Sequence, residues 1–202
     1  MPIHFIAVDF QKDFVVAGGA CYQDRPCVEF IQRILVPHCR KHGTQIAEII
    51  SDYRQPRPGI PFAHCVPGTP GYESQLAVDV TDPRAWVKCM HSPVWVRKNG
   101  GVAAKPPGRP YQDPDGFTRW LASVIGPPQD QHTIVLFGLT LDCCVLCTAQ
   151  ELFFRGYGVN VLVEGVDSYS GSPEDKRSLF NIPLPNWGKP VSWQDIKNRL
   201  LI

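Results

Sequence analysis

The sequence predicts an α/β domain with a mainly parallel central sheet. Short apolar runs alternate along the chain with segments of helical periodicity, and this order is typical of parallel strands joined by helices. The chain has 202 residues, 44% of them hydrophobic and 19% charged, which suits one globular domain with a single core. We therefore expect residues 1–202 to fold as one domain.

The first part of the chain predicts two strands and a helix. Residues 3–9 are almost wholly apolar, as in a strand that is buried on both faces. Apolar residues then recur at three-to-four spacing over 24–42, which predicts a helix that Pro37 kinks or shortens. Residues 44–51 are predicted to form the second strand.

Two loops rich in proline and glycine, at 53–72 and 100–114, flank a short predicted strand. The first loop is long for a compact domain, which usually indicates a functional role. The strand between the loops is expected at 94–96 and ends at Lys98.

The remainder of the chain continues the alternation. A helix is expected at 115–125, a strand at 132–137, and a second helix that carries three cysteines and ends near Arg155. The last predicted elements are a strand at 159–163 and helices at 174–180 and 193–201. No motif indicates a role for residues 171–202.

Composition excludes several classes of function. The net charge is +1, so nothing indicates a nucleic acid or an anionic membrane as partner. No apolar run is long enough to span a bilayer, and the first residues lack the features of a signal peptide. We therefore expect a cytoplasmic protein whose eight cysteines form no disulfide framework.

Three reactive side chains follow predicted strands. Asp9 ends the first strand, Lys98 follows the third, and Cys144 follows the strand at 132–137. The carboxyl ends of parallel strands meet at one edge of a sheet, where α/β proteins place their sites. A thiol at a helix start is expected to have a lowered pKa.

These residue types suit thiol catalysis. Asp9 can accept the thiol proton and Lys98 can favour the thiolate. Backbone N–H groups at the start of the cysteine helix can stabilise an oxyanion.

In this order, the motifs resemble those of the isochorismatase-like cysteine hydrolases, which include nicotinamidases. The resemblance is carried by residues 8–14 (VDFQKDF), 97–98 (RK) and 138–145 (GLTLDCCV), and residues 64–71 (HCVPGTPG) are similar to a nicotinamidase loop. It implies a three-layer α/β/α fold, a catalytic triad of Asp9, Lys98 and Cys144, and homo-oligomers.

The same resemblance implies the details of the cysteine turn. It places a cis peptide bond at Leu139-Thr140 and an oxyanion hole made by the N–H groups of Thr140 and Cys144. It assigns the nucleophile to Cys144 rather than Cys143. In the family the cysteine is followed by Val and, after two further residues, by Thr-Ala, and Cys144 is followed in this way by Val145 and residues 148–149.

One position departs from the metal-binding members of the family. They have Asp-x-His and a later histidine, whereas this chain has Asp52, Arg54 and His64. Arginine is a permanent cation and does not bind metals. We therefore expect no metal and no cofactor, and we expect Arg54 to pair with Asp52 and to supply positive charge where the metal would be.

The sequence thus predicts a hydrolase of a small carboxamide or related C–N bond that works through a thioester, with Asp9 as the base in both half-reactions. The residues expected to contact the substrate are Phe14, Arg54, His64 and Tyr169. Three alternatives stay open: an isochorismatase-type hydrolase of another bond, a thiol redox or peroxide-sensing protein that uses Cys144 and Cys147, and a catalytically silent binding protein.

Overall fold

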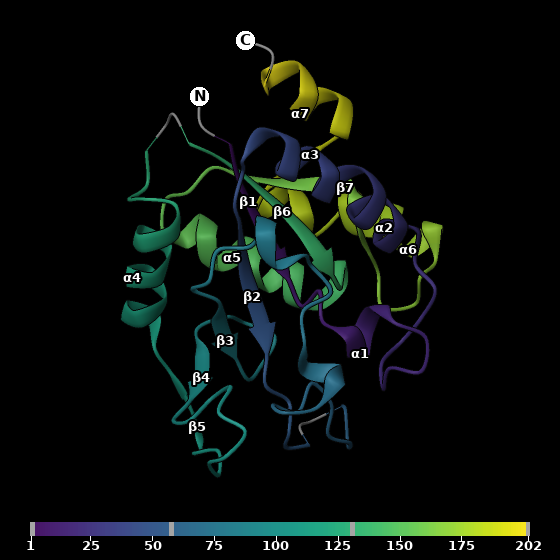
Figure 1. The fold of residues 1–202 in the computed structure, drawn as a ribbon. Helices are drawn as coiled ribbons and strands as arrows, with labels where there is room; N and C mark the ends of the chain where they lie inside the picture. The colour runs from purple at the N-terminus through teal and green to yellow at the C-terminus, as the bar shows by residue number, and fades with distance from the viewer. Residues whose placement is uncertain (1–2, 57–58, 130–131, 201–202) are drawn as a thin grey trace.

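The computed structural model describes residues 3–56, 59–129 and 132–200 and has a six-stranded sheet at its centre (Figure 1). The strand order is β3-β2-β1-β6-β7-β8, and every neighbouring pair is parallel. The expected α/β class with a mainly parallel sheet is confirmed. The sheet strands are β1 (Ile3–Val8), β2 (Ile46–Ser51), β3 (Trp86–Lys88), β6 (Thr133–Leu139), β7 (Val159–Asp167) and β8 (Lys189–Val191).

The helices are close to the predicted ranges. The α-helices are α1 (Lys12–Val15), α2 (Pro26–Phe30), α3 (Val36–His42), α4 (Pro114–Val124), α5 (Leu146–Phe154), α6 (Pro173–Asn181) and α7 (Trp193–Leu200). The π-helical turns η1 (Ile31–Leu35) and η4 (Leu141–Val145) precede α3 and α5, and the short 3₁₀ turns are η2 (Pro70–Tyr72), η3 (Val78–Val80) and η5 (Leu184–Asn186). Residue 201, expected at the end of the last helix, lies outside the described residues.

Helices cover both faces of the sheet, which makes three layers (Figure 1). Side chains of β1 alternate between two cores, with Phe5 in one and Ile6 in the other. The first core includes Ile31 and the α7 residue Ile196, and the second includes Leu121 of α4 together with α5. Among the described residues no helix is both long and apolar enough to cross a membrane.

The helix that Pro37 was predicted to kink or shorten contains a π-helical turn just before this proline. The helix expected over 24–42 is interrupted at η1, and Pro37 lies in the first turn of α3. Proline has no N–H group and its ring clashes with the carbonyl four residues earlier, and a π-helical turn is a common way to accommodate such a break.

The third strand of the sheet was predicted at the wrong place. The segment around Val96 forms β4 (Trp95–Arg97), which pairs with β5 (Pro110–Gln112) in a separate antiparallel hairpin. The strand next to β2 is β3, which the sequence analysis missed, as it missed β8. These segments have three residues each, and a run so short carries no periodicity that separates a sheet strand from a hairpin strand.

Candidate active site

Asp9, Lys88 and Cys144 meet at the carboxyl edge of the sheet. The Lys88 Nζ atom lies 2.8 Å from Asp9 Oδ2 and 3.3 Å from Cys144 Sγ. It also donates to the Ser51 hydroxyl at 2.7 Å, and that hydroxyl donates to Asp9 Oδ1 at 2.7 Å. The side chains of Lys88 and Asp9 are 0% and 1% exposed, so the thiol lies above a buried ion pair.

Lys98 does not belong to this group. It is exposed and follows the hairpin strand β4, whereas Lys88 is the last residue of β3. The two segments have similar sequences, Trp86-Val87-Lys88 and Trp95-Val96-Arg97, and only the pairing of β3 with β2 places the first at the sheet edge. The cation beside the thiol is therefore Lys88, and the predicted assignment to Lys98 is corrected.

The turn before the cysteine helix is shaped by backbone geometry. Gly138 has a φ of 110°, and a Cβ atom there would lie 2.1 Å from the Val8 carbonyl oxygen, so only glycine fits between β1 and β6. The Leu139-Thr140 peptide bond is cis, where the resemblance implied it. The helical turn η4 then begins at Leu141 and carries Cys144.

The thiol does not have the lowered pKa that its place at a helix start predicted. Burial raises the pKa of Cys144, the cation of Lys88 acts in the opposite direction, and the carboxylate of Asp9 raises it further. Burial also acts to lower the pKa of Lys88, but its contacts with Asp9, Cys144 and Tyr53 outweigh this and leave it well above the usual value. The site therefore holds a neutral thiol beside a charged lysine and needs a base.

Two further side chains contact the sulfur. The hydroxyl of Tyr53 lies 3.6 Å from Cys144 Sγ and 2.6 Å from Lys88 Nζ, and it donates to the Met90 carbonyl at 3.0 Å. The Nδ1 atom of His91 lies 3.5 Å from Cys144 Sγ. Neither residue could be predicted from the sequence, because both lie in irregular segments. His91 lies three residues after Lys88, and this spacing becomes informative only once β3 is known to end at Lys88.

A pocket opens beside the thiol. Its volume is about 40 Å³, and its walls include Asp9, Thr140 and His91. One buried water needs ~10–15 Å³ on this measure, so the pocket holds a group of a few heavy atoms. Two of the predicted substrate residues, Phe14 and Tyr169, line it.

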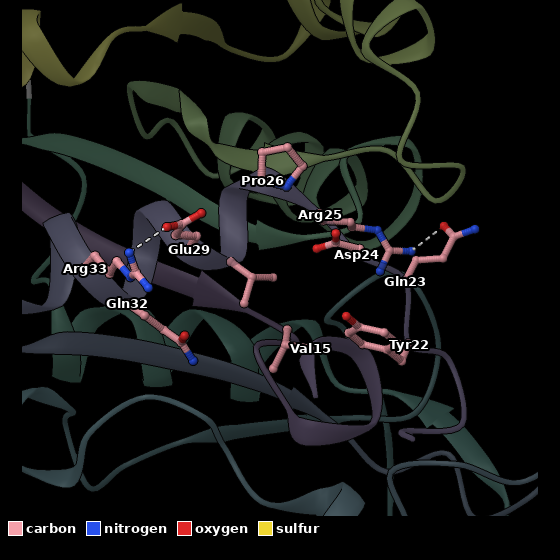
Figure 2. A pocket seen from close by; sticks show the side chains of 10 residues that line it. Val15, Tyr22, Gln23, Asp24, Arg25, Pro26, Glu29, Gln32 and Arg33 are labelled. Carbon is pink, nitrogen blue, oxygen red and sulfur yellow. Dashed lines mark hydrogen bonds and ion pairs between the residues drawn. The ribbon is translucent and has the colours of Figure 1, made fainter. Parts of the chain in front are cut away.

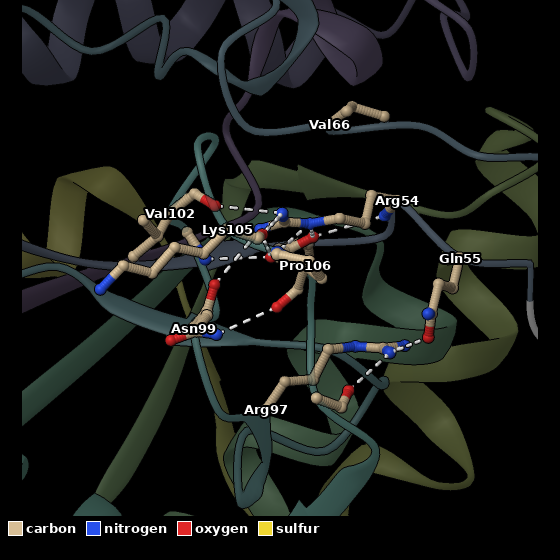
Figure 3. Close-up of polar contacts among 12 residues, drawn as sticks. Arg54, Gln55, Val66, Arg97, Asn99, Val102, Lys105 and Pro106 are labelled. Atoms are coloured by element: carbon tan, nitrogen blue, oxygen red, sulfur yellow. Dashed lines mark hydrogen bonds and ion pairs between the residues drawn. The ribbon is translucent and has the colours of Figure 1, made fainter.

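Arg54 and His64, the other two predicted substrate residues, have different surroundings. Arg54 Nε donates to Asp52 Oδ1 at 2.8 Å, so the predicted pairing with Asp52 is present. One Nη atom of the guanidinium group also donates to Asp52, and both Nη atoms bind loop carbonyls (Figure 3). Its Nη atoms donate to the carbonyls of Val102, Lys105 and Asn99 at 3.1, 3.0 and 3.3 Å.

Arg54 therefore fastens the loop after β4 to the end of β2. Its Nε and both Nη atoms donate to protein acceptors, so the predicted use of this group to hold a substrate carboxylate or carbonyl is not supported. His64 packs its ring against Phe14 and Tyr53, at centroid distances of 5.7 and 4.9 Å. In this position it is part of an aromatic cluster behind the pocket wall formed by Phe14.

A larger pocket of about 430 Å³ lies between the loop before α2 and α2 itself (Figure 2). Its walls include Tyr22, Arg25 and Arg33 and do not include Cys144. Arg25 connects the two regions, because its guanidinium donates to the Tyr169 carbonyl at 2.9 Å. This pocket is therefore separate from the thiol. Arg25, in its wall, holds the backbone of Tyr169, which lines the pocket beside the thiol.

Comparison with solved structures identifies the architecture. A pyrazinamidase of Pyrococcus horikoshii in complex with zinc has a TM-score of 0.64 at 20% identity, over 95% of this chain and 99% of that chain. The chain has the isochorismatase-like hydrolase fold. An isochorismatase family protein of Desulfovibrio vulgaris gives a TM-score of 0.65 at 18% identity, over 99% of this chain and 98% of that one.

The yeast nicotinamidase bound to the inhibitor nicotinaldehyde is similar to this chain with a TM-score of 0.65 at 16% identity, over 95% of this chain and 100% of that one. A scan against protein-family models and a search of curated protein sequences find no match. The predicted resemblance is therefore confirmed at the level of the fold.

A divalent cation does not fit the positions at which the resemblance implies metal ligands, which are occupied by Asp52, Arg54 and His64. The Asp52 carboxylate, whose side chain is 0% exposed, accepts from Arg54 Nε and from the Gly101 N–H at 2.9 Å. The guanidinium thus engages both carboxylate oxygens of Asp52, and a metal cation bound to the same carboxylate would be repelled by it. Within the described part of the chain, no three histidine, cysteine or acidic side chains are grouped so as to bind a metal.

Proposed function

We propose that this protein is a cysteine hydrolase of a small carboxamide or related C–N bond, with Cys144 as the nucleophile. The observation that carries the proposal is the buried Lys88, whose Nζ atom contacts both Asp9 and the Cys144 sulfur beside a pocket. The solved structures of similar fold include nicotinamidases and an N-carbamoylsarcosine amidase. This supports a hydrolase acting on C–N bonds.

In the first half-reaction, Asp9 accepts the thiol proton and the sulfur attacks the amide carbon. The N–H groups of Thr140 and Cys144 stabilise the oxyanion, and the charge of Lys88 stabilises the sulfur anion before attack. Collapse of the tetrahedral intermediate breaks the C–N bond. The amine or ammonia leaves with the proton that Asp9 received, and a thioester on Cys144 remains.

The size of the pocket favours a small reacting group. A carboxamide head group has three heavy atoms, which suits the volume of about 40 Å³ next to the sulfur. A substituent on the amide carbon would then lie at the mouth, near Ile60 and Tyr169. Tyr169 is 51% exposed, so its ring is available to contact such a substituent.

The redox alternative is less well supported than hydrolysis. Burial raises the pKa of both Cys144 and Cys147, whereas redox-active thiols of this spacing usually have a lowered pKa. The buried Asp9–Lys88 pair also has no role in thiol–disulfide exchange. An isochorismatase-type reaction on a different bond stays the second candidate, because the fold is shared by enzymes that act on several bonds.

We also propose that the reaction needs no metal, because the guanidinium of Arg54 occupies the carboxylate of Asp52. Prolonged dialysis against EDTA is expected to leave turnover unchanged, and metal analysis of the purified protein is expected to find well under one equivalent. Loss of activity on dialysis, restored by zinc or iron, would overturn this part of the proposal.

The function is tested by screening small amides for ammonia release with the wild-type protein and the Cys144→Ala variant. We expect at least one amide to be hydrolysed by the wild type, and the variant to be slower by about 10³-fold or more. A variant as active as the wild type would contradict the role of Cys144. Cleavage of non-amide substrates alone would favour the second candidate.

A further inference from the structure

The polar neighbours of the Cys144 sulfur differ in how deeply they are buried. The ion pair of Asp9 and Lys88 is fully buried. His91 is only partly buried, lines the pocket, and places Nδ1 at 3.5 Å from Sγ. A heavy-atom contact of this kind is the geometry that proton transfer between a thiol and an imidazole requires.

Asp9 lines the same pocket as His91, but its carboxylate is already engaged by other groups. Both of its carboxylate oxygens already accept hydrogen bonds, from Lys88 at 2.8 Å and from the Ser51 hydroxyl at 2.7 Å. A water molecule that attacks a thioester on Cys144 has to enter from the pocket. His91 lies on that side, three residues beyond Lys88, in the segment that connects β3 to β4.

We infer that His91 is a second acid–base residue of the site and serves the hydrolysis of the thioester. In this step His91 Nδ1 accepts a proton as an O–H bond of water breaks, and the water oxygen bonds to the acyl carbon. The C–S bond then breaks, and the proton on Nδ1 returns to sulfur, so the acid product leaves and the Cys144 thiol is restored. No other reactant is needed.

The contact between His91 and the Cys144 sulfur also affects how the thiol reacts with an electrophile when no substrate is bound. Cys144 is a neutral thiol because burial raises its pKa, so its alkylation requires a base that accepts the proton. We infer that His91, whose Nδ1 contacts Cys144 Sγ at 3.5 Å, shares this role with Asp9. The charged and titratable groups near the contact include Lys88 with its partners Asp9 and Tyr53. Cys143 and Tyr169 line the same pocket. Glu151 of α5 accepts from Ser92 Oγ, next to His91 in the chain, at 2.9 Å.

The inference rests on the proposed function for its catalytic meaning, and its test does not need a substrate. The rate at which iodoacetamide alkylates Cys144 is measured from pH 5 to pH 9 by mass spectrometry of the Cys144 peptide. The proteins are the wild type, His91→Asn and the control His42→Asn, which changes an exposed histidine of α3. Cys147 serves as an internal reference, and thermal unfolding checks that each variant is folded.

We expect the wild-type rate to rise with pH through the range in which imidazole loses its proton. His91→Asn is expected to lose this rise and to react at least about tenfold more slowly at pH 8, in keeping with the size of general-base effects. His42→Asn should match the wild type. An unchanged rate and profile in His91→Asn would overturn the inference.

The two proposals can fail separately. If no amide is hydrolysed but His91→Asn slows alkylation of Cys144 as described, the acid–base role stands and the proposed function fails. If amides are hydrolysed through Cys144 and alkylation does not depend on His91, the function stands and the inference fails. With an active substrate, His91→Asn should also accumulate the thioester, because its hydrolysis becomes the slow step.

Discussion

At the scale of single residues, substitution of two lysines tests whether Lys88 or Lys98 is the cation that the site needs. Lys88→Met is expected to abolish turnover and to destabilise the protein by ~3–5 kcal/mol, because it leaves the Asp9 carboxylate buried without its cation. Lys98→Met changes an exposed side chain and should alter stability by less than about 0.5 kcal/mol. Activity assays and urea unfolding of the pair measure both effects.

Equal effects of the two substitutions, or a larger effect of Lys98→Met on turnover, would contradict this assignment.

The reactivity of Cys144 follows from its surroundings. Because burial raises the pKa of the thiol, the thiolate fraction at any pH below that pKa is smaller than in free cysteine. Alkylation of Cys144 by iodoacetamide at pH 7 is therefore expected to be slower than that of free cysteine, even in an active enzyme. A faster reaction would show that the thiol is ionised in the empty site.

Arg54 is expected to stabilise the loop rather than to bind substrate. Arg54→Met leaves the fully buried Asp52 carboxylate without its cation, at a cost of ~3–5 kcal/mol. In a chain of this size that corresponds to a fall in melting temperature of roughly 6–20 °C. The matched control is Arg109→Met, which changes an exposed arginine of the same loop and should melt like the wild type.

At the scale of the elements, β1 and β6 position the cysteine turn through their close approach at Gly138. The residue pairs with Val8, and a Cβ atom would meet the Val8 carbonyl oxygen. Gly138→Ala is expected to cost ~1–3 kcal/mol for the backbone conformation alone and to lower kcat sharply, although it removes no side chain from the site. Full activity in this variant, measured alongside calorimetry, would show that the turn tolerates displacement.

The elements also show what the sequence was able to predict. β1 and β6 are long apolar strands with a distinctive turn after each, so Asp9 and Cys144 were predicted correctly at the sheet edge. The lysine was not, because two triplets of similar composition compete and only tertiary pairing decides between them. Tyr53 and His91 gave no signal, since their position depends on how irregular segments fold back onto the sheet.

At the scale of the whole molecule, the parallel sheet brings together Asp9 after β1, Lys88 at the end of β3 and Cys144 in the helical turn after β6. Two helical layers remove the ion pair from water, and this burial keeps the thiol neutral and makes a base necessary. The fold alone does not determine the substrate, because loops at this edge vary between proteins of one architecture. Here Arg54 holds one such loop in place.

The proposed hydrolysis of an amide requires that Cys144 forms a thioester. The most direct measurement is an acid quench of the protein during turnover, followed by mass spectrometry of the peptide that contains Cys144. We expect this peptide to gain the mass of the substrate's acyl group and the adduct to disappear when the substrate is exhausted. Cys144→Ala should neither form the adduct nor turn over. Continued turnover by Cys144→Ala, with no adduct on the wild-type peptide, would contradict the account.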